Sequence, residues 1–121
     1  MRILSQLMIF LVSVEHIYFF YLETFAWTSP STRRKFATTA EFATASRALA
    51  ANQGLYNSFL AAGLSWSLLH HEARFAWQLQ AFFLTCVIAA ALFGAFTVKR
   101  SILLIQGVPA LLALILAFLT S

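Results

Sequence analysis

Two glutamates and a histidine lie within a stretch of sequence that is otherwise strongly apolar. The stretch VEHIYFFYLETFAW (14–27) holds Glu15, His16 and Glu23 among aromatic and aliphatic residues. A carboxyl group and an imidazole placed side by side can accept, hold and pass on a proton near neutral pH. Because ionised groups are costly in apolar surroundings, we expect these three residues to be proton-transfer groups with a function.

A second polar stretch, ANQGLYN (51–57), supplies hydrogen-bonding groups of another kind. Asn52 and Tyr56 are four residues apart, as are Gln53 and Asn57, so each pair lies on one face of a helix. A few polar side chains in apolar surroundings are typical of a small-ligand site. The predicted ligand-binding residues are Glu15, His16, Glu23, Asn52, Gln53, Tyr56, Asn57 and Gln106.

The composition indicates that these residues belong to an integral membrane protein. Of the 121 residues, 61% are hydrophobic and 10% are charged, whereas soluble domains average about 45–50% apolar and roughly 25% charged residues. A helix needs about 20 residues to cross the hydrocarbon core. We therefore expect an all-α fold, in which residues 1–121 form a single membrane domain of four antiparallel transmembrane helices. The predicted spans are about 3–27, 48–69, 75–98 and 102–119.

The connections between these spans support this division. The first, loop 28–47, contains three consecutive cations, and Thr38 with Glu41 has the spacing of a helix-capping box. We therefore expect an interfacial helical segment before the second span. The links HHEAR (70–74) and KRS (99–101) are short, which makes consecutive helices antiparallel neighbours.

The distribution of cations predicts the orientation. Six of the eight Lys and Arg residues lie on the side of the first and third connections, and two lie on the other side. The positive-inside rule places the side with more cations in the cytoplasm, so loop 28–47 is expected there and both termini outside. The net charge of +4 then reflects topology, and we expect the lipid bilayer as a partner and no nucleic acid.

The embedded polar residues gather in the cytoplasmic half of the predicted bundle. Beyond them the segments 60–64, 82–84 and 111–119 are largely apolar. This pattern predicts a one-sided, cytoplasm-facing polar pocket with an apolar floor, and not an open pore.

Other chemistry has little support in the sequence. Cys86 is the single cysteine and lies in an apolar run, so we expect a small buried hydrophobic residue. His70 and His71 are adjacent, which points their side chains about 100° apart on a helix, and they are expected to anchor a span end at the interface. We expect no metal site and no cofactor.

Four segments of the chain resemble a known family. They are VEHIYFFYLETFAW, FATTAEFA, ANQGLYNSFLAAGL and ILLIQGVPALLALIL, and they are similar to domain-of-unknown-function family 1304, a group of small bacterial membrane proteins. The resemblance implies four membrane helices, localisation in the bacterial cell (inner) membrane and no particular activity. The motif residues that it implies are Glu15, His16, Glu23, Trp27, Asn52, Gln53, Gly54, Tyr56 and Asn57.

Three functions fit these observations. The first is binding or proton-coupled transport of a small ligand, in which Glu15 and His16 exchange a proton and a homodimer encloses the site. The second is a small intramembrane enzyme acting on a lipid or isoprenoid, with Glu15 or Glu23 as general acid or base and Tyr56 as polariser. The third is an accessory or scaffold subunit, assembled through the polar cluster. In the first, favoured function, Glu15 and Asn57 are expected to share one hydrogen-bonded neighbourhood.

Overall fold

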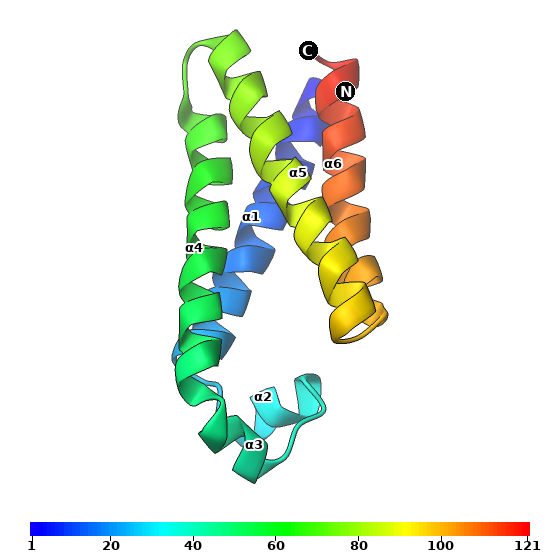
Figure 1. Ribbon diagram of the computed structural model, residues 1–121. Coiled ribbons are helices and arrows are strands. Elements are labelled where there is room, and N and C mark those ends of the chain that lie inside the picture. The colour runs from blue at the N-terminus through cyan, green and yellow to red at the C-terminus, as the bar shows by residue number, and fades with distance from the viewer. The chain divides into compact units, whose positions relative to one another are not determined.

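The computed structural model describes residues 1–121 and is entirely helical, which confirms the predicted all-α class. The elements are α1 (Arg2–Thr24), α2 (Pro30–Lys35), α3 (Ala40–Ala45), α4 (Arg47–Leu69), α5 (Ala73–Thr97), a π-helical turn η1 (Leu103–Gly107) and α6 (Val108–Leu119) (Figure 1).

The chain forms two compact units. One consists of Met1–Val14 with Leu60–Ser121, and the other of Glu15–Phe59. Helices α1 and α4 each contribute one part of their length to each unit. We call these the terminal unit and the middle unit.

The terminal unit packs segments of α1, α4, α5 and α6 around one hydrophobic core. Its members come from all four helices, and α5 and α6 lie side by side (Figure 1). At Gly63 the ring of Phe83 packs directly on the α4 backbone, where a Cβ atom would collide with it. Small residues at helix contacts allow this kind of close approach in membrane bundles. The core residues are Ile9, Val12, Leu64, Leu84, Val87, Ala110 and Ala113.

The terminal unit exposes many large apolar side chains on its outer surface, whereas several of its buried residues are alanines. Ala110 and Ala113 are fully buried, whereas Ile3, Phe93 and Phe96 are 73%, 71% and 89% exposed. Soluble monomers rarely expose large contiguous apolar surfaces, and lipid chains would cover such a surface in a bilayer.

Two helices, α1 and α5, are long and apolar enough to cross a membrane by length and composition. Helix α4 has 23 residues, but the polar residues of its first half lower its hydropathy. The last apolar segment, Leu103–Leu119, is shorter. Membrane association is therefore supported by two of the four predicted spans.

A π-helical turn interrupts the last predicted span. The N–H of Val108 bonds to the carbonyl of Leu103, five residues earlier, and Pro109 follows directly. Proline lacks the N–H group that an α-helical hydrogen bond requires, and π-turns are inserted at such irregular points. Gln106 lies within this turn.

The middle unit contains two short helices between α1 and α4. Helix α2 is capped by Ser29, whose hydroxyl accepts the N–H of Thr32 at 3.3 Å. The hydroxyl of Thr39 accepts the N–H of Phe42 at 3.1 Å and caps α3. A helical segment does precede the second predicted span, but its cap is one residue later than the predicted Thr38.

Trp27 connects the end of α1 to this helical segment. Its indole N–H donates to the hydroxyl of Ser46 at 3.1 Å, between α3 and α4. Its ring also packs edge-on against Phe36, with ring centroids 4.9 Å apart. These contacts fix the short helices against the point where α1 ends.

Candidate functional site

Glu23 is the buried centre of a hydrogen-bonded polar group in the middle unit, in which Asn57 is partly buried and Gln53 is exposed. Glu23 lies in the last turn of α1 and is 2% exposed. The Oε1 atom accepts a hydrogen bond from Nδ2 of Asn57 at 2.5 Å, and Oε2 accepts one from Nε2 of Gln53. Gln53 and Asn57 are one turn apart on α4, so both amides reach the same carboxylate. We call these three residues the Glu23 group.

Gly54 allows α4 to approach α1 closely enough for these bonds. A Cβ atom at Gly54 would collide with Oγ1 of Thr24 and would lie 3.1 Å from Cβ of Glu23 and 3.2 Å from the carbonyl oxygen of Phe20. The hydroxyl of Thr24 donates to the carbonyl of Ala51 at 3.2 Å, which adds a polar contact beside the glycine.

The hydrogen bonds of the Glu23 group define its chemistry. An ionised carboxylate only accepts hydrogen bonds, and both amide groups donate to it. When Glu23 takes up a proton, one of its oxygens becomes a donor and a weaker acceptor, so the hydrogen bond from the amide that faces this oxygen is weakened. Protonation of Glu23 is thus coupled to the arrangement of Gln53 and Asn57.

Glu15 and His16 lie further back along α1. His16 is 1% exposed, and its ring packs edge-on against Phe19 at 5.5 Å. Glu15 is partly buried, and its Oε1 atom makes no hydrogen bond. Glu15 and Glu23 are about 12 Å apart along the helix axis at the standard helical rise. The hydrogen-bonded partner of Asn57 is therefore Glu23 and not Glu15.

The remaining predicted ligand-binding residues lie outside the Glu23 group. Asn52 is exposed, and Tyr56 is 59% exposed with its ring edge-on to Phe59. Gln106 is partly buried in η1 and belongs to the terminal unit. Of the predicted residues, the structure joins Glu23, Gln53 and Asn57 by hydrogen bonds.

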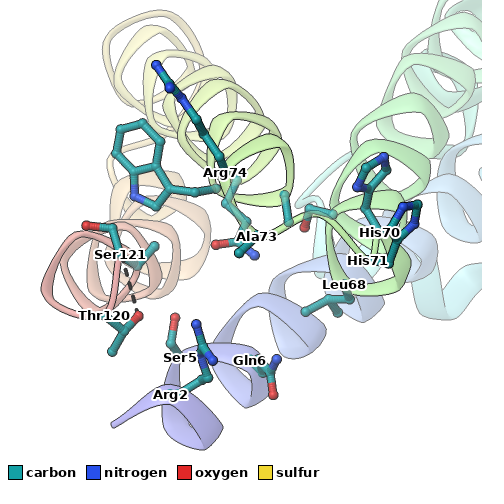
Figure 2. Close-up of a pocket in the computed structure, with 15 residues that line it drawn as sticks. Arg2, Ser5, Gln6, Leu68, His70, His71, Ala73, Arg74, Thr120 and Ser121 are labelled. Carbon is teal, nitrogen blue, oxygen red and sulfur yellow. Dashed lines mark hydrogen bonds between the residues drawn. The ribbon is translucent and has the colours of Figure 1, made fainter.

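Sequence reasoning missed a cavity of about 560 Å³ in the terminal unit (Figure 2). It lies where α1 and α5 begin and where α4 and α6 end, and we call it the helix-end cavity. Arg2, Ser5, Arg74, Trp77 and Thr120 are among its lining residues. The only signal in the sequence was the concentration of polar residues at these four helix ends.

Possible metal ligands are not gathered into a cluster. His70 and His71 stack with ring centroids 5.0 Å apart, and Nδ1 of His70 accepts the N–H of Glu72 at 3.1 Å. No three His, Cys, Asp or Glu side chains come together. Cys86, expected to be buried, is only partly buried on α5.

Comparisons with known proteins give one family and one relative. A family model of proteins of unknown function, DUF1304, matches residues 10–118. The uncharacterized protein YpaA of Lactococcus lactis subsp. lactis (strain IL1403) is 37% identical over 120 residues, which cover 98% of this chain and 99% of YpaA. No solved structure shows a significant match. The resemblance of the sequence motifs is confirmed, and the chain belongs to the DUF1304 family.

Proposed function

We propose that this chain is a four-span membrane protein that binds a small polar or cationic ligand in exchange for a proton at Glu23, in proton-coupled binding or transport. The observation that carries the proposal is the Glu23 group. A carboxylate that is 2% exposed has both oxygens held by amides from a second helix. Interhelical hydrogen bonds in membranes average only about 0.6 kcal/mol, a small stabilisation for burying an ionisable group.

The proposed membrane placement rests on the surface of the protein. The apolarity of α1 and α5 and the exposed aliphatic and aromatic residues favour a lipid environment. We place α4 and the segment Leu103–Leu119 as the other two spans, with Gln53 and Asn57 of α4 bonded to Glu23 of α1. The excess of cations in residues 28–47 and 99–100 then places the Glu23 group on the cytoplasmic side.

The exchange follows from the hydrogen-bonding capacity of Glu23. A proton, or a ligand that carries a positive charge or an N–H group, competes for the same two carboxylate oxygens. Each therefore changes the hydrogen bonds that the carboxylate accepts from Gln53 and Asn57. Glu15 and His16 lie further back along α1 and can also hold a proton. In this proposal they pass protons to and from Glu23. A second copy of the chain would enclose the ligand, since four helices surround little volume.

The test is a flux measurement in proteoliposomes that contain a pH-sensitive dye. A panel of small primary and quaternary amines is added under an imposed proton gradient. We expect amine-dependent proton movement with the natural chain and none with Glu23→Gln. Glu41→Gln, which alters an exposed carboxylate on α3, serves as the control and should behave like the natural chain. Equal flux and equal pH dependence for Glu23→Gln and the natural chain would refute the proposal.

A further inference from the structure

The helix-end cavity presents hydrogen-bond donors and positive charge from two helices. Its lining side chains include Arg2 and Arg74 and no aspartate or glutamate. Figure 2 shows Arg2 and Ser5 reaching into it from α1, opposite the first residue of α5, Ala73. We propose that this cavity binds a phosphate group, a role separate from the Glu23 group.

The start of α5 supplies backbone donors. This helix has 25 residues, and Glu72 before it makes no side-chain cap hydrogen bond. The N–H of Ala76 bonds to the carbonyl of Glu72 at 2.9 Å, so the amides of the three residues before it have no partner within the helix. Such amides, together with the helix dipole, favour an anion.

Ser5 and Trp77 provide an independent sign of a ligand. Ser5 is 3% exposed and lines the cavity, and the indole N–H of Trp77, another lining residue, is buried without a hydrogen-bond partner. By contrast, the hydroxyls of Ser67 and Thr120 at the same cavity donate to the carbonyls of Leu64 and Leu116. Buried polar groups are nearly always paired, so the free indole N–H of Trp77 indicates a missing acceptor, and a phosphate oxygen would also accept from Ser5 and Arg2.

The surroundings of the cavity suit a phosphate carried by a lipid. Ile3, Phe118 and Leu119 are 73%, 57% and 65% exposed and adjoin the lining residues Arg2, Ala117 and Thr120 in sequence. These side chains offer an apolar surface for acyl chains next to the donors. A soluble phosphate compound would use the same donors without this apolar contact, so the two sources are separable by experiment.

The test is isothermal titration calorimetry of the full chain in phosphate-free detergent solution. Purification tags are removed first, because residues at both chain ends line the cavity. The three probes are inorganic phosphate, dihexanoyl phosphatidylglycerol, and dihexanoylglycerol, which has the same tails but no phosphate. Saturable binding of either phosphate-bearing probe is expected. Tighter binding of phosphatidylglycerol assigns a lipid as the source, and equal affinity assigns a soluble phosphate.

Variants connect the binding to this cavity. We expect Arg2→Gln to weaken binding by about tenfold, the usual scale for one charge-assisted hydrogen bond. Ser5→Ala, a small change in a buried side chain, should weaken it by roughly threefold or more. Lys99→Gln removes the same charge from a residue outside the lining and should leave the affinity unchanged. The proposal is overturned if neither phosphate probe binds, if dihexanoylglycerol binds as well, or if Arg2→Gln matches Lys99→Gln.

Discussion

The side-chain amide of Asn57 donates a hydrogen bond to Oε1 of Glu23 at 2.5 Å and joins two residues that are 34 positions apart in the sequence. Gln53 bonds to the other carboxylate oxygen. In hydrocarbon, a polar group without a partner costs several kcal/mol, so these bonds strongly favour one axial position of α4 against α1 within the middle unit.

Replacing the carboxylate should weaken the middle unit. In Glu23→Gln one acceptor oxygen becomes an NH₂ group facing an amide donor, so we expect a loss of about 1–3 kcal/mol in the free energy of unfolding. Glu41→Gln, at an exposed position, should change it by less than about 0.5 kcal/mol. Denaturant unfolding in detergent, followed by circular dichroism, measures both. Equal stabilities of the two variants would show that the Glu23 group does not stabilise the fold.

A methyl group at Gly54 should separate α1 from α4. Its Cβ would collide with Thr24 and press on Glu23, so Gly54→Ala is expected to destabilise the protein by about 1–3 kcal/mol. At Gly94 the nearest atoms belong to the side chain of Ile102, at 3.2 Å or more. There the helix propensity of alanine, worth about 1 kcal/mol, should offset the crowding. The same unfolding measurement would contradict this reasoning if Gly94→Ala were the more damaging change.

Two serines join α1 to α4 in the terminal unit, and their energies should be coupled. The hydroxyl of Ser13 donates to the carbonyl of Ala61 at 3.0 Å and lies 2.9 Å from the hydroxyl of Ser65. Each single change to alanine should cost about 0.5–1.5 kcal/mol. The double variant should cost about 0.6 kcal/mol less than the sum of the two. Strict additivity in this double-mutant cycle would mean that the two hydroxyls do not interact.

The proposed four-span topology predicts which residues face each side of the membrane. In a Cys86→Ser background, single cysteines are placed at the exposed positions Ser31, Glu72 and Lys99. We expect an impermeant thiol reagent to label positions 31 and 99 from the cytoplasmic side and position 72 from the opposite side. Labelling of positions 31 and 72 from one side would show that α4 does not cross the bilayer.

Much of the helical architecture could be predicted because it depends on local properties of the chain. The run predicted at 48–69 corresponds to α4, Arg47–Leu69, and the run at 75–98 corresponds to α5, Ala73–Thr97. The run at 102–119 is divided by η1. An apolar pattern contains no information on hydrogen-bond spacing near a proline, so this turn was not predicted.

The candidate site could be predicted only in part. Helical spacing placed Gln53 and Asn57 on one face, but it could not decide whether they would meet Glu15 or Glu23. That choice depends on the axial position of α4 along α1, which is set by the packing of Gly54. The helix-end cavity depends on four helix ends that are distant in the sequence, so no local pattern could reveal it.

A pH titration by nuclear magnetic resonance can follow the coupling of Glu23 to its two amides in the reconstituted protein. Glutamate carboxyl carbons and the side-chain amide nitrogens of Asn and Gln are isotopically labelled, and Glu23→Gln assigns the Glu23 signal. We predict that the amide signals of Gln53 and Asn57 shift with the same midpoint as the Glu23 carboxyl carbon, and that this shift is lost in Glu23→Gln. Two results would contradict the proposed role of Glu23 as the proton-binding group. One is that the amide signals do not shift at the midpoint of the Glu23 carboxyl carbon, and the other is that they still shift in the Glu23→Gln variant.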